Sequence, residues 1–459
     1  MVRTCQERHA VDTSKRALSR FGLGARIGEP ERIGDARQWL RAQLERPQPT
    51  LAGTELGEIA VVLRDLRRAQ RARDRERLMA IQRRTREIQS SELNSMLSAR
   101  ITSDTPYVER LVAFWSNHLC VSVVASRQIA ALAGHYERTV IRPHVLGNFT
   151  DMVMASAKHP AMLFYLDNVQ SMGPGSDAAQ RGRRGGRAQG LNENYARELM
   201  ELHTLGVEAG YTQQDVEQLA RILTGWTTSS AGPGSRRDGP LGFIFRPFVH
   251  EPGQKTVLGK RYPEDGIGEG EQAIRDLCAH PATAHFVAGK LVQHFVSDGP
   301  PPGAVEEIAG VFTDTGGDLA AVSLALIDLE EAWSPDSKKF RTPQDWLVAV
   351  FRAVRAQEAP EQMPQLLRQL RHAPWGPTAP KGYGDMRREW ADPDSLMNRA
   401  ELARSLARRW GRSGLEPTRL LDVVDVPQGD PLRKLLADRN VPAPERFALA
   451  IGGPAFQWR

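Results

Sequence analysis

Residues 191–206 form the stretch of this chain whose polar side chains are best placed to do chemistry. At about 100° per residue, four of them fall within one quadrant of a helix: Asn194, Arg197, Glu198 and Glu201. Two carboxylates in this position can bind a divalent metal, or can act as general acid and general base if their environments differ. A neighbouring arginine can hold an anionic or polar group of a substrate. The quadrant is therefore the first candidate for a catalytic site.

The same quadrant also fits a structural role, and the sequence leaves both interpretations open. In that alternative, Arg197, Glu198 and Glu201 form a buried, fully paired network that joins neighbouring helices. His203 lies almost opposite Glu201 on the helical wheel, so we expect a structural role for this histidine. A divalent metal is a candidate cofactor only in the catalytic interpretation.

Two histidines could complete a catalytic site around these carboxylates. His118 borders the apolar face of a helix expected over residues 104–124, and His250 follows a short β-prone stretch. Either histidine could serve as the second acid or base, or as a metal ligand. For His118 the structural alternative is a buried histidine whose hydrogen bonds are satisfied.

A further set of residues is expected to contact substrate. Asn192 could instead cap the helix that follows it, and Asp167-Asn168 could instead form a turn at the end of an apolar run. Two more candidates lie on the next helix and at its end. The expected substrate-binding residues are Asn192, Asn194, Asp167, Asn168, Arg221 and Trp226.

Several common enzyme motifs are missing from the sequence. Residues 253–260 resemble a phosphate-binding loop, but five residues separate the glycines and neither Ser nor Thr follows the lysine. The sequence contains no HExxH zinc motif and no GxSxG nucleophile elbow. Gly22-Leu-Gly24 follows a basic helical segment instead of a strand, which argues against a dinucleotide-binding fold.

The composition limits the partners that the chain can have. Its formal net charge is +6, from 61 basic and 55 acidic residues. Acidic residues are interleaved with the ten arginines between Arg64 and Arg86. This mixture is typical of a solvated helix face, so we do not expect nucleic-acid binding. Three cysteines are too few for a disulfide scaffold. No apolar run reaches the roughly 18 residues of a membrane span, and the first 30 residues lack the apolar segment of a secretory signal, so cytoplasmic localisation is expected.

The hydrophobic periodicity is helical through most of the chain. We expect an all-α protein, a large multi-helix single unit, with a small β-hairpin insertion near residues 240–260. Residues 1–100 would form an N-terminal helical region with long Arg-rich helices, and residues 101–459 the main helical domain. Residues 171–190 are expected to be a flexible Gly/Arg loop, and residues 229–268 an irregular segment. Thr212, with Asp215 three residues later, predicts a helix start with a capping box.

The chain resembles a bacterial family, domain-of-unknown-function family number 1800. The resemblance rests on motifs spread along the sequence: Ala17-Leu-Ser-Arg-Phe-Gly-Leu-Gly24, Trp115-x-Asn-His118, His159-Pro-Ala-Met162, Tyr165-Leu-Asp-Asn168, Leu191-Asn-Glu-Asn-Tyr-Ala-Arg-Glu-Leu-Met-Glu-Leu-His203, Tyr211-Thr-Gln-Gln-Asp-Val216, Leu223-Thr-Gly-Trp226, His280-Pro-Ala-Thr-Ala284 and Pro454-Ala-Phe-Gln457. It implies a single, mostly helical unit. Where the family commonly has His-Asp, this chain has His250-Glu251, which weakens an expectation of metal binding there.

The resemblance also implies a partner. Members are often encoded beside a sulfatase-like secreted protein that carries a twin-arginine signal, so periplasmic localisation by co-export is the alternative expectation. Our leading hypothesis is a hydrolytic enzyme with a carboxylate, His and Arg pocket, in which Glu198 or Glu201 acts either as general base or as metal ligand. The alternative hypothesis is a non-catalytic scaffold or partner subunit of such a sulfatase-like protein.

Overall fold

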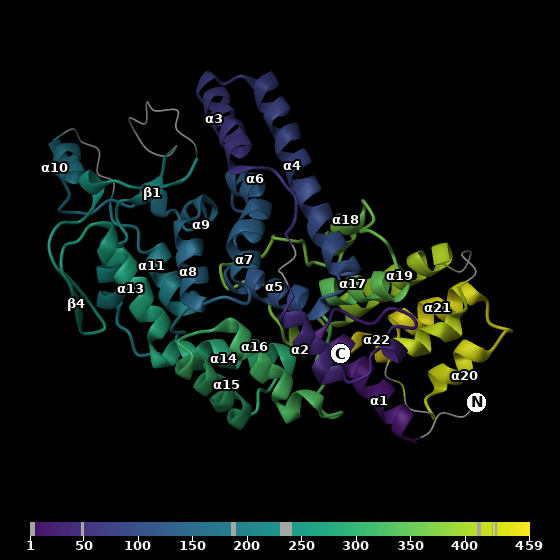
Figure 1. The fold of residues 1–459 in the computed structure, drawn as a ribbon. Coiled ribbons are helices and arrows are strands. Elements are labelled where there is room, and N and C mark those ends of the chain that lie inside the picture. The colour runs from purple at the N-terminus through teal and green to yellow at the C-terminus, as the bar shows by residue number, and fades with distance from the viewer. Residues whose placement is uncertain are drawn as a thin grey trace.

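A computed structural model describes residues 5–46, 50–184, 190–229, 241–410, 415–424, 426 and 429–459. Within these ranges the chain forms 22 α-helices and two small antiparallel sheets (Figure 1). The prediction of a mostly helical protein with a small β insertion is confirmed. No helix in the described ranges is long and apolar enough to cross a membrane.

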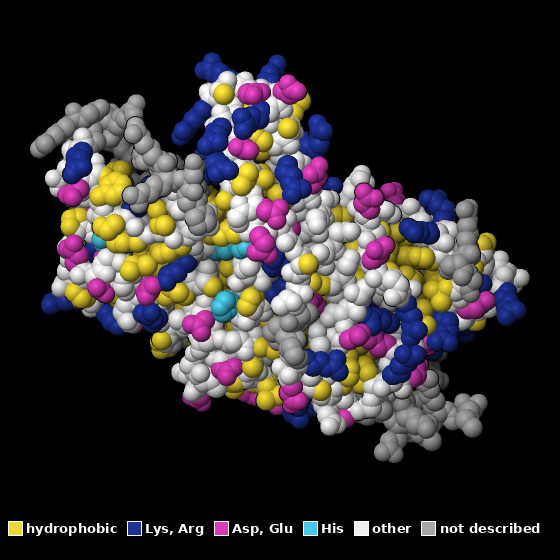
Figure 2. Space-filling model, turned by 45° about the horizontal axis from the view of Figure 1, so that its top comes forward, with side chains coloured by type: hydrophobic (Ala, Val, Ile, Leu, Met, Phe, Trp, Pro, Cys, Tyr) yellow, Lys and Arg dark blue, Asp and Glu magenta, His cyan; other side chains and the backbone are white. Residues whose placement is uncertain are grey.

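The N-terminal helices include a long pair that projects from the body. The apolar contact between them near the projecting end is made by Leu66, Ala69 and Ile81, and Asp74 caps the second helix by accepting from the backbone of Arg77. Basic side chains, all of them Arg in this part of the sequence, gather at the exposed end (Figure 2), and some acidic residues are paired to them, such as Asp65 with Arg77 at 3.3 Å. These helices are α1 (Cys5–Arg16), α2 (Ala36–Leu44), α3 (Leu56–Ala72) and α4 (Arg75–Thr102).

The middle of the chain supplies the helices that surround the sequence-predicted site. Thr212 and Asp215 form the predicted capping box at the start of α12. The helices are α5 (Pro106–His118), α6 (Arg127–Tyr136), α7 (Arg142–His144), α8 (Phe149–Lys158), α9 (Pro160–Tyr165), α10 (Asp177–Arg184), α11 (Asn194–Glu198), α12 (Gln213–Ile222), α13 (Ile267–Ala279), α14 (Pro281–Phe295), α15 (Pro302–Asp314) and α16 (Leu319–Asp328).

The C-terminal helices pack on the other end of the body (Figure 1). They are α17 (Pro343–Ala353), α18 (Met363–Gln369), α19 (Pro393–Trp410), α20 (Pro431–Ala437), α21 (Ala443–Gly452) and α22 (Pro454–Gln457). One hydrophobic core extends from Ala17 to Phe456, and residues of α2 and α4 belong to it. The body of the N-terminal region therefore shares its core with the rest of the chain instead of forming a separate one.

Three of the four strands lie within the segment expected to be irregular, residues 229–268, and the first strand ends directly before it. Strand β1 (Trp226–Thr228) pairs with β2 (Phe243–Phe245), and β3 (Lys255–Val257) pairs with β4 (Lys260–Tyr262). Residues 230–240 of that segment lie outside the described residues. The expected loop 171–190 differs from the prediction, because residues 177–184 form helix α10, where the backbone of Ala179 donates to Ser176 Oγ. Residues 185–189 of that loop also lie outside the described residues.

Candidate functional site

The predicted catalytic helix is shorter than expected, because α11 ends at Glu198. A π-helical turn, Leu199–His203, continues the chain, and its wider spacing rotates the later residues relative to the predicted wheel. Arg197 contacts Glu193 at 3.2 Å, Glu201 at 3.4 Å and the side-chain oxygen of Gln213 at 2.7 Å. Arg197 and Glu201 thus lie together, in a partly exposed network of paired side chains.

Glu198 lies apart from that network, and no hydrogen bond to its carboxylate occurs within the described residues. Its side chain is half-buried, and burial together with the charge of Glu201 raises its pKa. The pKa values of Cys120 and Tyr165 are raised mainly by burial, and the charge of Glu198 adds to the increase. The Glu198 carboxylate therefore lies near both side chains. Glu198 and Glu201 therefore have different surroundings.

Most of the expected substrate-binding residues hold the backbone in place. Asn168 is buried and donates to the carbonyls of Leu223 at 3.1 Å and Trp226 at 2.9 Å. Asn192 Oδ1 accepts from the backbone of Asn194 at 2.9 Å, which is the capping alternative. Asn192 also donates to the carbonyl of Asp167, a residue in the left-handed region with φ of 57°. Trp226 is fully buried, whereas the side chains of Asn194 and Asp167 are exposed.

His250 and Arg221 belong to a second cluster, around β3 and α12. The imidazole of His250 is buried and contacts Glu269 and, at 3.2 Å, the ammonium group of Lys255. Its Nδ1 lies 2.8 Å from the carbonyl oxygen of Thr224. Lys255 also pairs with the same Glu269 oxygen at 3.0 Å, while the other oxygen, Oε2, is buried and has no hydrogen-bond partner within the described residues.

Glu251, which follows His250, connects two segments. One carboxylate oxygen accepts from Arg221 at 2.6 Å, and the other accepts from the backbone of Gly175 at 2.7 Å. The extra methylene of Glu relative to Asp gives the side chain the reach for both contacts. Among the residues that the structure describes, no group of three or more His, Cys, Asp and Glu side chains is arranged to hold a metal ion.

The structure instead places one predicted residue, His118, on the wall of a cleft of about 250 Å³. The cleft lies between the end of α5, α14, the start of α17 and the segment 372–389. Asn117 anchors that segment, because its side chain accepts from the backbone nitrogen of Tyr383 and donates to the Tyr383 carbonyl, both at 2.8 Å. Gly382 lies so close that a Cβ there would be 2.4 Å from the carbonyl oxygen of Asn117. Polar and aromatic side chains line the cleft, among them His118, Lys290, His294, Asp345, Asp385, Phe114, Trp375 and Tyr383.

His118 and Lys290 contact each other on one wall of the cleft. Lys290 Nζ donates to Nδ1 of His118 at 2.9 Å, and the Nε2–H of His118 donates to the carbonyl of His203 at 3.1 Å. Burial, together with the charge of Lys290, holds the pKa of His118 well below its usual value. Burial likewise lowers the pKa of Lys290 to about 8. The imidazole is therefore neutral at pH 7, in a tautomer fixed by these two contacts.

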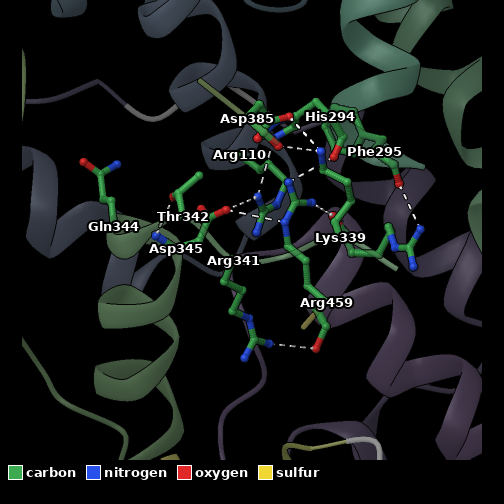
Figure 3. Close-up of polar contacts among 12 residues, drawn as sticks. Arg110, His294, Phe295, Lys339, Arg341, Thr342, Gln344, Asp345, Asp385 and Arg459 are labelled. Carbon is green, nitrogen blue, oxygen red and sulfur yellow. Dashed lines mark hydrogen bonds and ion pairs between the residues drawn. The ribbon is translucent and has the colours of Figure 1, made fainter. Parts of the chain in front are cut away.

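A network of ion pairs lies behind another wall of the cleft (Figure 3). His294 Nδ1 donates to Asp385 at 3.0 Å, and Arg110 contacts Asp345 at 3.2 Å. Arg459 Nε lies 3.4 Å from the same oxygen of Asp345. Burial would raise the pKa of Asp385, but His294 and nearby cations lower it to about 2. These acids are therefore ionised and paired.

Cys120 also lines the cleft, but its thiol is a poor nucleophile. Burial raises its pKa to about 12, and the thiol hydrogen points to the carbonyl of Pro380 at 3.1 Å. By contrast, Lys290 combines a lowered pKa with a position on the cleft wall, which is what a general base requires. The amine of Lys290 is therefore the group in the cleft best suited to accept a proton.

Sequence reasoning missed Lys290, His294, Asp345 and Asp385. A signal was present for two of them, because Lys290 and His294 are four residues apart and so share one face of α14. Asp385 lies in a stretch without regular secondary structure that is rich in Pro, Gly and Trp, and loops often carry function. No local pattern connects either aspartate to residues 118 or 290.

Comparison with known proteins gives the family of the chain and nothing more specific. No curated protein and no solved structure matches the chain. The family model described as "Protein of unknown function (DUF1800)" matches residues 16–456, nearly the whole sequence. The chain therefore belongs to the DUF1800 family.

Proposed function

We propose that this protein is a hydrolytic enzyme in which Lys290 is the catalytic base. The observation that carries the proposal is the Lys290–His118 contact of 2.9 Å on the wall of the cleft. Within the described residues, Lys290 has no carboxylate within ion-pair distance. Burial lowers its pKa to about 8. Desolvation without a paired acid gives this lysine a larger neutral, basic fraction near pH 7 than an ordinary lysine has.

The reaction needs only water and groups of this chain. The neutral amine of Lys290 takes a proton from a water molecule in the cleft, and the water oxygen forms a bond to the electrophilic atom of the substrate. The bond from that atom to the leaving-group oxygen breaks, and the leaving group takes the proton back from the Lys290 ammonium. One water is consumed, an acid and an alcohol are released, and Lys290 returns to its neutral form.

His118 acts as a positioning residue in this proposal. Its Nδ1 accepts one hydrogen from Lys290, and its Nε2–H is fixed by the His203 carbonyl, so the lone pair of the amine can face the cleft. An asparagine at this position places an acceptor oxygen near the place of Nδ1. His118→Asn is therefore expected to retain part of the activity and the pH profile, while His118→Leu loses the orientation of the amine.

The test is hydrolysis of p-nitrophenyl acetate, phosphate and sulfate by the full chain. We expect hydrolysis of at least one of them, lowered at least 10²-fold in Lys290→Met, the usual range for loss of a general base. Lys434 is exposed on α20, so Lys434→Met is the matched control and should retain the wild-type rate. Equal rates for wild type and Lys290→Met, or no hydrolysis of any of the three above the buffer rate, would overturn the proposal.

A second candidate function is supported by the closed contacts elsewhere in the chain. Arg197 is paired with Glu193, Glu201 and Gln213, and Glu251 with Arg221, as expected for a scaffold whose polar residues fix helix packing. In this alternative the chain is a non-catalytic subunit, for example of a sulfatase-like secreted protein with which it would be exported. The alternative predicts loss of stability, with no catalytic effect, in Arg197→Ala, whose unfolding would be measured in denaturant.

A further inference from the structure

The acidic residues that line the cleft are already paired with groups of the protein. Asp345 contacts Arg110 at 3.2 Å and Arg459 at 3.4 Å. Asp385 contacts His294 at 3.0 Å and Lys339 at 3.4 Å. The third, Glu389, accepts from the backbone nitrogen of Met386 at 2.9 Å and caps the short turn that begins there. Two of the three carboxylates are therefore compensated by cations of the protein, whereas the exposed Glu389 is held by a backbone amide alone.

The basic residues of the lining are not compensated in the same way. Arg100 has a partner, Glu137, at 3.4 Å. Within the part of the chain that the structure describes, Lys290, Lys381 and Arg388 have no carboxylate within ion-pair distance. Lys381 and Arg388 are exposed on the segment 372–389, and Lys290 lies on the wall formed by α14. The cleft thus presents three cations without a paired acid.

The network behind the wall adds positive charge. It contains three acids, Asp298, Asp345 and Asp385, and the basic residues Arg20, Arg110, Arg341, Arg459 and Lys339. Burial and the charge of Arg459 lower the pKa of Arg20 to about 9 and that of Arg110 to about 10. The five basic residues outnumber the three acids at this place, and a cleft wall of low dielectric constant focuses the resulting field on a bound ligand.

We propose that the cleft binds a small substrate in which an oxyanion is attached to an apolar body. Lys381 and Arg388 would contact the oxyanion, and the apolar body would lie against Phe114, Trp375 and Tyr383, which line the same cleft. Carboxylate, sulfate and phosphate groups share this chemistry. The inference rests on the proposed function for the place where the substrate binds, and it adds the class of substrate.

The test measures binding of benzoate, phenyl sulfate and phenyl phosphate by calorimetry, with neutral benzamide as the uncharged analogue. We expect at least one anion to bind at least tenfold more tightly than benzamide, and the strongest of the three names the oxyanion class. The double variant Lys381→Gln/Arg388→Gln should lose roughly tenfold in affinity for that anion, with no change for benzamide. The control Lys434→Gln/Arg439→Gln changes two exposed cations outside the cleft and should bind like wild type. Equal affinities for benzamide and the anions, or an unchanged affinity in the cleft variant, would overturn the inference.

Lys290→Met separates this inference from the proposed function. If the Lys290→Met variant no longer hydrolyses substrate while the anion still binds through Lys381 and Arg388, the catalytic role and the substrate class both stand. If this variant hydrolyses substrate like wild type while the double variant loses anion binding, the catalytic role fails and the substrate class stands. If hydrolysis depends on Lys290 but the anions bind no better than benzamide, the substrate class fails alone.

Discussion

The ammonium nitrogen of Lys290 lies 2.9 Å from Nδ1 of His118, although 172 residues separate the two in the chain. The contact uses the only lone pair of a neutral imidazole, whose other nitrogen donates to the carbonyl of His203. A histidine held in this way has no free nitrogen for proton transfer. The acid–base chemistry of the cleft therefore belongs to the lysine, and the histidine orients it.

The pH dependence of hydrolysis should report the titration of Lys290. Because burial lowers its pKa to about 8, the basic fraction grows as pH rises. We expect kcat/KM to rise about tenfold per pH unit below pH 8 and to level off above it. Lys290→Arg places a side chain here that stays protonated and positively charged. This variant should therefore lose the activity, and with it the rise of kcat/KM below pH 8. A wild-type profile that is flat from pH 6 to pH 9 would contradict the assignment.

Asp345 should be essential for stability, because it is paired with two buried guanidinium groups. Asp345→Asn removes the charge and leaves Arg110 and Arg459 without this carboxylate, which should cost about 3–5 kcal/mol in the free energy of unfolding. Asp314→Asn, an exposed change at the end of α15, should stay within about 0.5 kcal/mol of wild type. Denaturant unfolding of both variants measures the difference, and a loss below about 1 kcal/mol for Asp345→Asn would argue against this role.

The protein should lose stability in mild acid, because several histidines are buried in the neutral form. Burial lowers the pKa of His135 and His294 to about 4 and that of His203 and His372 to about 3. As pH falls from about 6.5 toward these values, the unfolded chain binds protons that the folded chain does not, so stability falls. The slope is about 1.4 kcal/mol per pH unit for each such histidine.

The share of one histidine in this slope can be isolated with His372→Phe. The His372 ring is stacked on Trp390, and phenylalanine keeps an aromatic ring there without a titratable nitrogen. Denaturant unfolding from pH 6.5 to pH 4.5 should therefore show that the free energy of unfolding falls less steeply with pH than in wild type. The difference in slope should equal the contribution of one histidine. His285→Gln, at an exposed position, should leave the slope as it is in wild type. An unchanged slope in His372→Phe would contradict the prediction.

Glu251 should not tolerate a shorter carboxylate. Glu251→Asp withdraws the group from Arg221 and from the amide of Gly175, and an unpaired buried donor costs about 1–3 kcal/mol. Faster hydrogen exchange at Gly175 is the specific signature. Glu264→Asp is the matched control, because Glu264 also accepts from a glycine amide, that of Gly253, but at an exposed position. Equal stability losses in the two variants would show that burial of the Gly175 contact contributes nothing.

The helices follow from local sequence patterns, whereas the cleft does not. The capping box of Thr212 and Asp215 depends on neighbouring residues, so the sequence predicts it. The helical wheel placed Glu198 and Glu201 in one quadrant, but it assumed an uninterrupted α-helix, and the π-helical turn after Glu198 changes that geometry. Periodicity cannot show which helices meet.

The cleft depends on contacts between distant segments. Asp385 reaches His294 only because Asn117 anchors the backbone of Tyr383, and Arg459 reaches Asp345 only because the end of the chain pairs with Lys339. These contacts join residues that are 91 to 266 positions apart. A single sequence contains no local signal for them, and so it predicted His118 as a candidate without its partner Lys290.

Competitive acetylation of the folded protein tests the central claim most directly, because it needs no substrate. Trace acetic anhydride reacts with neutral amines only, and mass spectrometry of the digested protein gives the rate at each lysine as a function of pH. We predict a midpoint near pH 8 for Lys290, well below the ordinary value of about 10.4 for a lysine side chain. A midpoint for Lys290 at that ordinary value would contradict the account.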